Sequence, residues 1–217
     1  MEWSKIWVLF FFWNILAFGQ NSFQEEVLEI QKRLDTIEKG VKPRVVFTGS
    51  SSIRMWDDIV TRFPEVQVLN TGFGGSHCSD LLYFIQELVL DYEPDRVFIY
   101  EGDNDIFAKK RPKKVIETFT SVLETLEKER PDLDIVLISA KPSIARWHYR
   151  GRYKRLNKRL KKLVEERPKV SYVDVWDVML NGKKLNRTLF IEDGLHMNSS
   201  GYDIWYGVLK PLVVATK

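Results

Sequence analysis

Short apolar runs alternate with longer amphipathic patterns along most of the chain. The apolar runs are Val45–Thr48, Val66–Leu69, Val97–Tyr100, Ile135–Ser139 and Tyr172–Val175. Helical patterns lie between them at 53–63, 79–90, 113–129 and 152–166, and a last one lies near 201–214. Continuous apolar strands between helices are typical of a parallel sheet that is buried on both faces. The pattern therefore predicts the α/β class, as a three-layer α/β/α sandwich with a five-stranded parallel sheet.

A further apolar stripe precedes the first strand and predicts an N-terminal helix within 20–42. Its members step by four and three residues and are Phe23, Val27, Ile30, Leu34 and Ile37. The stripe lasts barely two heptads, so packing on the domain is favoured over a dimerising coil. Gly40 and Pro43 then end the helical pattern.

The first residues, 1–19, differ from the rest of the chain. An apolar run covers 6–18 and is interrupted only by Asn14, which makes it shorter than the about 20 residues that a membrane span needs. The small residues Ala17 and Gly19 suit a cleavage site. We predict a cleaved signal peptide over 1–19 and a secreted or periplasmic protein. An uncleaved N-terminal anchor is the alternative, because an acidic residue offsets the basic charge before the run.

Length and composition indicate one further domain over 43–217. The chain has 217 residues, of which 44% are hydrophobic, enough for one substantial core. A net charge of +3 does not by itself imply nucleic acid as a partner. The single cysteine, Cys78, cannot form an internal disulfide, so the core must stabilise the exported protein.

One segment is strongly basic. Arg150 to Lys162 contains eight basic residues and no acidic one. Leu156, Leu160 and Leu163 recur at helical spacing within and beside it, which predicts an amphipathic helix with a solvated basic face. An anionic surface or an acidic glycan as partner is the alternative interpretation.

Four polar motifs follow predicted strands or precede predicted helices. They are Phe47-Thr48-Gly49-Ser50-Ser51-Ser52, Asn70-Thr71-Gly72-Phe73-Gly74-Gly75, Gly102-Asp103-Asn104-Asp105 and Asp193-Gly194-Leu195-His196. The first three motifs follow the first three strands, and the last one follows the fifth strand after a longer connection. Ligand sites in such sheets lie outside the carboxyl ends of the strands. We therefore expect all four motifs at one edge of the sheet.

These motifs together supply the parts of an ester-cleaving site. A serine hydroxyl needs a neighbouring base, which His196 can provide for Ser51, while Asp193 can hold the imidazole in the required tautomer. The oxyanion requires preorganised N–H donors. The backbone amides of Ser51 and Gly75 and the side-chain amide of Asn104 are the candidates.

With these motifs in view, the chain resembles the SGNH (GDSL-type) hydrolases over residues 44–210. The resemblance implies a flavodoxin-like fold, serine-dependent ester hydrolysis and the roles given above for each motif. It is closest to the branch of platelet-activating factor acetylhydrolase subunits and carbohydrate acetylesterases. The family's Gly-Asp-Ser reads Gly49-Ser50-Ser51 here, so Ser50 and Ser52 stay open as alternatives to the favoured nucleophile, Ser51.

Each motif residue also has an ordinary structural interpretation. Ser51 alone would suit a helix N-cap, Asn104 a turn, and His196 a loop without catalysis. Asp103 and Asp105 suggest a metal, but no set of side chains with ligand spacing accompanies them. The four motifs in this order favour catalysis without a metal or cofactor.

Other residues can line the rim of the predicted site. Lys141, Arg146 and Trp147 follow the fourth strand and suit recognition of a sugar or an anionic group, although a surface loop explains them equally well. Trp56 and Phe73 flank the motifs and can shape an acyl pocket, although core packing is the favoured role for both.

The sequence thus predicts a serine esterase for short-chain acyl esters, acetyl esters above all, with a small ester or an acylated glycan as substrate. A lysophospholipase or thioesterase-type acylhydrolase is one alternative. A non-catalytic glycan-binding protein on an esterase scaffold is another, because a fold alone does not establish a function. We expect no nucleic acid partner and no stable membrane span, and either a monomer or a homodimer.

Overall fold

The computed structural model describes residues 23–214 and divides the chain into two units, Met1–Glu38 and Lys39–Lys217. In the first unit a helix covers 23–34 and is followed by a turn, so the predicted N-terminal helix ends before Gly40. The predicted signal peptide, 1–19, lies outside the described residues. Within 23–214, no helix is both long enough and apolar enough to cross a membrane.

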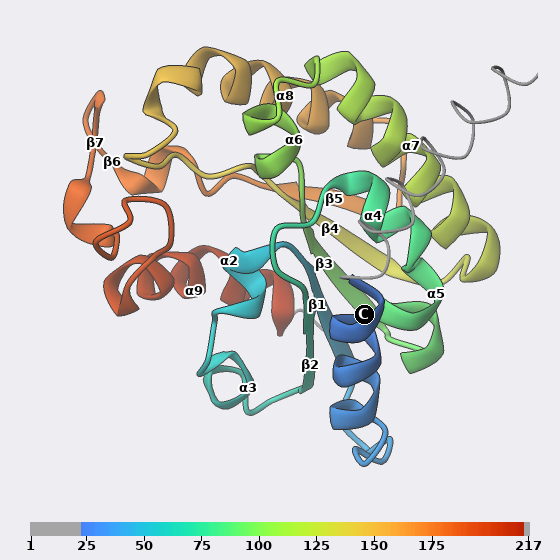
Figure 1. Cartoon of the computed structure of the whole chain (residues 1–217). Helices are drawn as coiled ribbons and strands as arrows, with labels where there is room; N and C mark the ends of the chain where they lie inside the picture. The colour runs from blue at the N-terminus through green and yellow to red at the C-terminus, as the bar shows by residue number, and fades with distance from the viewer. Residues whose placement is uncertain (1–22, 215–217) are drawn as a thin grey trace, which may run out of the picture. The chain divides into compact units, whose positions relative to one another are not determined.

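The second unit is built on a five-stranded parallel sheet with the strand order β2-β1-β3-β4-β5 (Figure 1). The strands are β1 (Arg44–Gly49), β2 (Gln67–Gly72), β3 (Arg96–Tyr100), β4 (Asp134–Ile138) and β5 (Val170–Val173). This order is that of the flavodoxin-like folds, in which the chain reverses its winding direction between β1 and β3. The predicted α/β class and the five-stranded parallel sheet are confirmed.

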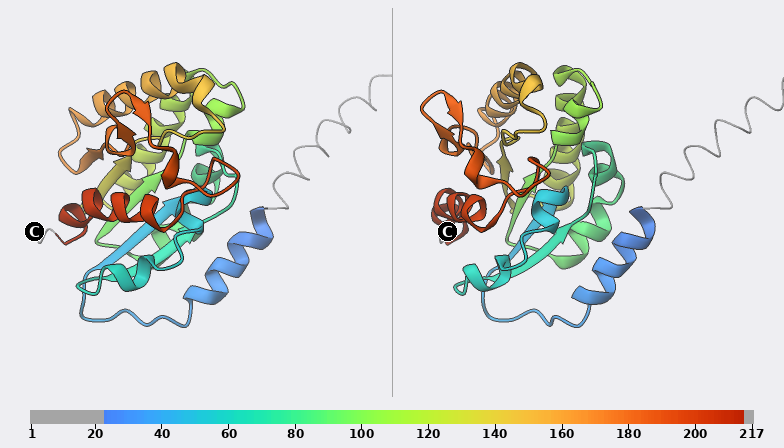
Figure 2. Two further views of the ribbon diagram at one scale, coloured as in Figure 1. Left: turned by 90° about the vertical axis from the view of Figure 1, so that its left-hand side faces the viewer. Right: turned by 60° about the vertical axis from the view of Figure 1, so that its left-hand side comes forward.

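Helices cover both faces of the sheet (Figure 1). One face carries α2 (Ser51–Arg54), α3 (Ile59–Arg62) and α9 (Ser199–Val213). The other carries α4 (Cys78–Tyr83), α5 (Ile85–Leu88), α6 (Asp103–Phe107), α7 (Pro112–Glu129) and α8 (Arg150–Val164). Figure 2 shows from two further directions that the sheet lies between α9 and the pair α7 and α8.

Between β5 and α9 the chain forms short elements and no further strand of the main sheet. They are η3 (Asp177–Met179), the hairpin β6 (Leu180–Asn181) and β7 (Lys184–Leu185), and η4 (Arg187–Leu189). Two more single turns, η1 (Leu90–Tyr92) and η2 (Trp147–Tyr149), precede β3 and α8. The connection from β5 to α9 therefore has room to carry a functional loop back to the sheet edge.

The core on the α9 side of the sheet is rich in aromatic rings. Phe47 on β1 stacks on Phe98 of β3 with ring centroids 4.5 Å apart. Trp56 stacks on Tyr202 of α9 at 5.2 Å and is fully buried. Aromatic pairs contribute about 0.5–1.5 kcal/mol beyond the burial of their area. The first contact therefore stabilises the pairing of β1 with β3, and the second helps to fix α9 against the segment between α2 and α3.

The helix predicted at 53–63 is wrong in its continuity, because the chain forms α2 and α3 with a break at Trp56. The break allows the indole of Trp56 to enter the core. The pattern at 79–90 likewise splits into α4 and α5 at Phe84. The short helix α6, which begins at Asp103, was read from sequence only as a turn.

The basic segment Arg150 to Lys162 lies in α8, as predicted. Leu156 and Leu160 are fully buried, and Leu163 is partly buried. The side opposite these leucines carries exposed lysine and arginine side chains. The prediction of an amphipathic helix is therefore confirmed, whereas a partner for its basic face stays a hypothesis.

Candidate active site

The sheet brings the first three motifs to one edge, at the carboxyl ends of the neighbouring strands β1, β2 and β3. Gly49 ends β1 with a φ of +123°, and a Cβ there would lie 2.0 Å from the carbonyl oxygen of Tyr100. The next backbone N–H, that of Ser50, donates to the same oxygen at 3.1 Å. Only glycine allows the two backbones to approach this closely. β1 and β3 therefore stay hydrogen-bonded up to Ser50, the residue that precedes Ser51.

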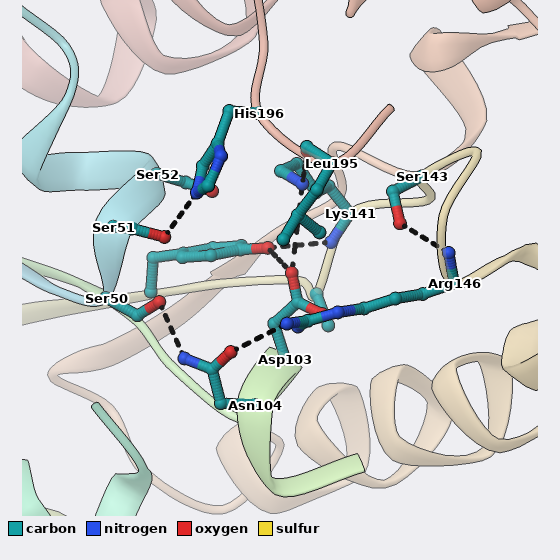
Figure 3. Close-up of polar contacts among 12 residues, drawn as sticks. Ser50, Ser51, Ser52, Asp103, Asn104, Lys141, Ser143, Arg146, Leu195 and His196 are labelled. Carbon is teal, nitrogen blue, oxygen red and sulfur yellow. Dashed lines mark hydrogen bonds and ion pairs between the residues drawn. The ribbon is translucent and has the colours of Figure 1, made fainter. Parts of the chain in front are cut away.

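The structure brings Ser51, His196 and Asp193 into one hydrogen-bonded chain. Figure 3 shows the Ser51 hydroxyl pointing toward the His196 ring, and Ser51 Oγ lies 2.9 Å from His196 Nε2. His196 Nδ1 lies 2.5 Å from Asp193 Oδ2. With Nδ1 donating to the carboxylate, Nε2 is free to accept the serine proton.

Asp193 also orders its own loop. Its Oδ1 accepts hydrogen bonds from the backbone N–H groups of Leu195 at 2.8 Å and His196 at 2.9 Å. Burial alone would raise the pKa of Asp193, but these two N–H groups and the imidazole outweigh it and hold the pKa below its ordinary value. The carboxylate is therefore ionised at neutral pH and suited to orient a histidine.

The three consecutive serines occupy different surroundings. Ser51 is half-buried and contacts His196, whereas Ser50 and Ser52 are buried. Ser50 Oγ instead accepts a hydrogen bond from Asn104 Nδ2 at 3.1 Å. The geometry thus favours Ser51 among the three serines.

The predicted oxyanion donors lie close together around Asn104. Its Nδ2 donates to the backbone carbonyl of Ser76 at 2.8 Å and to Ser50 Oγ, and these two residues neighbour Gly75 and Ser51 in the chain. Gly75 has a φ of +78°, and a Cβ there would have no heavy atom within 4 Å. The Gly75 backbone therefore borders open space beside the side-chain amide of Asn104.

Sequence reasoning missed a buried charged cluster beneath this site, centred on Asp103. The carboxylate accepts from Arg146 Nη1 at 2.7 Å and from the hydroxyls of Tyr153 at 2.7 Å and Tyr100 at 3.0 Å. Lys141 Nζ lies 3.8 Å from Asp103 Oδ2. Burial would raise the pKa of Asp103, but Lys141 and Arg146 together hold it below its ordinary value.

Lys141 and Arg146 were predicted at the rim, and the structure corrects their position. Lys141 is 1% exposed and donates to the backbone carbonyl of Leu195 at 2.6 Å. Arg146 is 9% exposed and donates from Nη2 to Asn104 Oδ1 at 3.0 Å. Both cations are occupied by protein groups, so they support the site from beneath and do not present a charge to a ligand.

The three aromatic residues predicted to contact the substrate differ in their burial. Trp56 and Phe73 are fully buried, which corrects the prediction that they shape an acyl pocket and favours their core-packing interpretation. Trp147 is half-buried, and its ring lies parallel to Trp176 with centroids 6.1 Å apart. Trp147 therefore stays a candidate for ligand contact.

The second aspartate of the third motif is also bound by protein groups. Asp105 accepts from Lys110 Nζ at 2.8 Å and from the backbone N–H of Cys78 at 3.0 Å. In the part of the chain that the structure describes, no group of three or more His, Cys, Asp or Glu side chains is arranged to hold a metal ion. Asp105 thus links the third motif to the start of α4, three residues after the second motif.

Comparison with known protein families identifies the family of this chain. The model of the GDSL-like lipase/acylhydrolase family matches residues 38–204, which is most of the chain. The chain belongs to this family. This GDSL-like protein is accordingly a carboxylic ester hydrolase.

Solved structures share the fold of this GDSL-like hydrolase. A Streptococcus pneumonia protein described as a platelet activating factor has a TM-score of 0.77 at 21% identity, covering 92% of this chain and 98% of its own. An acylhydrolase from Bacteroides fragilis has a TM-score of 0.70 at 24% identity, covering 84% and 93%. A catalytic mutant of Axe2, an acetylxylan esterase from Geobacillus stearothermophilus, has a TM-score of 0.69 at 17% identity, covering 83% and 98%. A search of the curated proteins finds no significant match.

Proposed function

We propose that this GDSL-like hydrolase is a serine esterase for short-chain acyl esters, with acetyl esters of carbohydrates as its main substrate class. The observation that carries the proposal is the chain of contacts from Ser51 Oγ to His196 Nε2, at 2.9 Å, and from His196 Nδ1 to Asp193 Oδ2, at 2.5 Å. A hydroxyl, an imidazole and a carboxylate in this order activate a serine for attack on an acyl carbon.

In the first half of the reaction, the acyl group moves to the enzyme. His196 Nε2 takes the proton of Ser51 as Oγ bonds to the ester carbonyl carbon. The tetrahedral intermediate then collapses, and the C–O bond to the alcohol breaks. The imidazolium gives its proton to the leaving alcohol oxygen, while the Asp193 carboxylate stabilises the positive charge on the ring.

In the second half, water releases the acyl group. His196 takes a proton from a water molecule, whose oxygen attacks the carbonyl carbon of the acyl-serine. Collapse of the second tetrahedral intermediate breaks the bond to Ser51 Oγ, which regains its proton from the imidazolium. The products are a carboxylic acid and free enzyme.

The oxyanion of both intermediates is stabilised by N–H donors. We assign this role to the backbone amides of Ser51 and Gly75 and to Nδ2 of Asn104. On attack, the developing oxyanion takes the place of Ser50 Oγ as the acceptor for one N–H of Asn104. Such donors typically contribute about 3–4 kcal/mol each to the transition state, because they are preorganised before charge develops.

Two comparisons support acetyl as the acyl group. One structural neighbour is described as an acetylxylan esterase, and another is an acetyl esterase variant with an acetate ion. Two structures of the acetylxylan esterase carry a serine-to-alanine and an aspartate-to-alanine replacement and are described as catalytic mutants. Both residue types have counterparts in the assignment of Ser51 and Asp193.

The proposal is tested by turnover of p-nitrophenyl acetate, butyrate and octanoate, and by acetate release from acetylated xylan. We expect Ser51→Ala to abolish turnover and Ser52→Ala, a change at the adjacent serine, to retain it. Ser50→Ala distinguishes the remaining alternative. We expect this variant to retain turnover, because Ser50 contacts Asn104 and not His196.

Each result has a distinct meaning. A fall in rate with acyl length supports the acetyl assignment, whereas faster turnover of octanoate would favour a lysophospholipase-type activity. Full activity of Ser51→Ala would remove Ser51 as the nucleophile and refute the mechanism. Turnover of p-nitrophenyl acetate without release of acetate from xylan would keep the mechanism and exclude that glycan.

We also propose that the enzyme is exported and that a signal peptide over 1–19 is removed. The support is the apolar run over 6–18 and the small residues at its end, Ala17 and Gly19. The intact mass of the protein recovered from the exported fraction of its host tests this step. A mass that retains residues 1–19 would favour the anchored alternative.

A further inference from the structure

Arg146 connects the oxyanion side of the site to the buried cluster beneath it. Figure 3 shows its side chain reaching from the loop after β4 toward Asp103 and Asn104. Nη1 donates to Asp103 Oδ1 at 2.7 Å, and Nη2 donates to Asn104 Oδ1 at 3.0 Å. The rigid guanidinium fork therefore holds two consecutive residues of the third motif at once.

We propose that Arg146 is a positioning residue that fixes the orientation of the Asn104 side-chain amide for oxyanion stabilisation. This inference rests on the proposed function, in which Asn104 Nδ2 is an oxyanion donor. An asparagine amide has one end that accepts and one end that donates, and a guanidinium only donates. The end that faces Arg146 must therefore be Oδ1, which directs Nδ2 away from Arg146 and toward the site.

A second contact requires the same orientation independently. Nδ2 of Asn104 lies 2.8 Å from the backbone carbonyl of Ser76, which can only accept a hydrogen bond. Turning the amide by half a revolution would place oxygen against oxygen at Ser76 and nitrogen against nitrogen at Arg146. Both ends of the amide thus disfavour the inverted arrangement, in which no N–H would reach the oxyanion.

The guanidinium is itself held from several sides. The Asp103 carboxylate pairs with it, and the centroid of the Phe107 ring lies 4.4 Å from its Cζ. The backbone of Arg146 is held separately, because its N–H donates to Ser143 Oγ at 3.3 Å. The guanidinium charge also polarises the Asn104 amide, because hydrogen bonds in a chain strengthen one another in a medium of low dielectric constant. Arg146 therefore affects both the direction and the donor strength of Nδ2.

This role has a kinetic signature that a merely structural role lacks. The oxyanion exists in the transition state and not in the bound substrate, so loss of its stabilisation lowers kcat and leaves KM nearly unchanged. Moreover, Arg146 acts through Asn104. Once the Asn104 amide is removed, a change at Arg146 can no longer lower kcat by misplacing that amide.

The test is a double-mutant cycle with Arg146→Lys and Asn104→Ala on p-nitrophenyl acetate. Lysine keeps a positive charge opposite Asp103 but lacks the fork that spans both partners. We expect Asn104→Ala to lower kcat by about 10²–10³-fold and Arg146→Lys to lower it by roughly 10-fold, each with KM within about twofold. The double variant is expected to be no slower than Asn104→Ala alone.

Lys141→Gln is the matched control, because Lys141 is also buried and lies beside the same Asp103 carboxylate, whereas the polar partners of its ammonium group are Asp103 and Leu195 and not Asn104. Its effect on kcat is expected to persist in the Asn104→Ala background. If the effects of Arg146→Lys and Asn104→Ala instead multiply, as for Lys141→Gln, Arg146 acts through the fold alone and the inference is wrong.

A second variant, Phe107→Ala, keeps the inference testable if Arg146→Lys does not fold. Phe107 is 50% exposed and stacks on the guanidinium, so Phe107→Ala loosens Arg146 without placing a new group in the core. We expect it to lower kcat in the wild-type background and not in Asn104→Ala. The inference would be overturned if Phe107→Ala and Arg146→Lys both left kcat unchanged. It would also be overturned if Asn104→Ala alone left kcat unchanged. Activity of Ser51→Ala reports separately on the proposed function.

Discussion

Ser51 Oγ lies 2.9 Å from His196 Nε2, although 145 positions separate the two residues in the chain. Ser51 begins the helix that follows β1, whereas His196 belongs to the loop that leads into α9. The loop is closed by a bridge between Phe190 and Met197 and by the bond from the Ile191 backbone N–H to the His196 carbonyl. The proposed nucleophile and its proposed base are therefore brought together only when this loop has folded.

The first prediction concerns the carboxylate behind the histidine. Asp193→Asn preserves the shape of the side chain but removes the charge that stabilises the imidazolium. We expect kcat to fall by about 10⁴-fold with little change in stability. Glu192→Gln, a loss of the same charge at the preceding exposed residue, is the control and is expected to be active. Comparable loss in both variants would mean that net charge, rather than the contact with His196, matters.

The second prediction concerns backbone conformation at Gly75. Gly75 has a φ of +78° with open space around a Cβ, and Gly182 in the β6–β7 turn has a φ of +62° with the same openness. Alanine at either position costs about 1–2 kcal/mol of stability through strain. Only Gly75→Ala is expected to lower kcat, by about 10-fold or more, because it alone displaces a proposed oxyanion donor. Chemical denaturation and ester turnover of the two variants check this.

The third prediction is a pH dependence of stability that originates at Glu101. Burial raises the pKa of this fully buried carboxyl well above its ordinary value of 4.5, although the Ser76 hydroxyl donates to it at 2.6 Å. A raised folded-state pKa gives stability that is complete below the unfolded-state pKa and is lost as pH rises through the folded-state value. Glu101→Gln mimics the protonated form and removes this loss.

We therefore expect the stability of the wild type, relative to Glu101→Gln, to decrease between pH 5 and pH 8. Urea unfolding of both proteins at the two pH values measures the difference. Glu117→Gln, at a carboxyl on the exposed side of α7 whose pKa is lowered by Lys114, is the control and is not expected to show this decrease. A constant difference between wild type and Glu101→Gln would mean that Glu101 is ionised in the folded protein.

The fourth prediction separates core packing from ligand contact at Trp56. Its ring lies in the aromatic core, 5.2 Å from Tyr202 and 6.1 Å from Phe47. Trp56→Phe is expected to lower the free energy of unfolding by about 1–3 kcal/mol through the cavity that it leaves. The acyl-length profile of turnover is expected to stay unchanged. A shifted profile at unchanged stability would restore Trp56 to the acyl pocket.

Much of the fold could be predicted from the spacing of apolar residues along the chain and from composition. The five strands begin and end within a few residues of the apolar runs. The agreement is helped by the burial of β1, β3 and β4 along almost their whole length, whereas β5, with Ser171 exposed, is displaced by two residues from the predicted run. The continuous helix at 53–63 was wrong for a tertiary reason. Trp56 gains more from the core than from helical continuity, and neighbouring residues along the chain do not reveal that competition.

The candidate site, too, could be predicted from the sequence only in part. The motifs that contain Ser51, Asn104 and His196 are local in sequence, so they were recognisable as candidates. The network around Asp103 is not local, because its partners come from β3, the loop after β4 and α8. A lysine and an arginine after a strand indicate a polar rim as readily as buried support. Only their burial and their contacts with Leu195 and Asn104 distinguish the two.

Lys141 has a consequence for how the enzyme loses activity on heating. Its Nζ donates to the carbonyl of Leu195. The turn around Asp193 and His196 is partly exposed between the buried Phe190 and Met197, and this bond and a few backbone contacts hold it in position. Segments with few anchoring contacts open at lower free energy than the core. We expect thermal inactivation to precede the loss of circular dichroism, with the loop as the first part to separate. Reinforcement of this loop, rather than of the core, is then the effective route to a more heat-resistant catalyst.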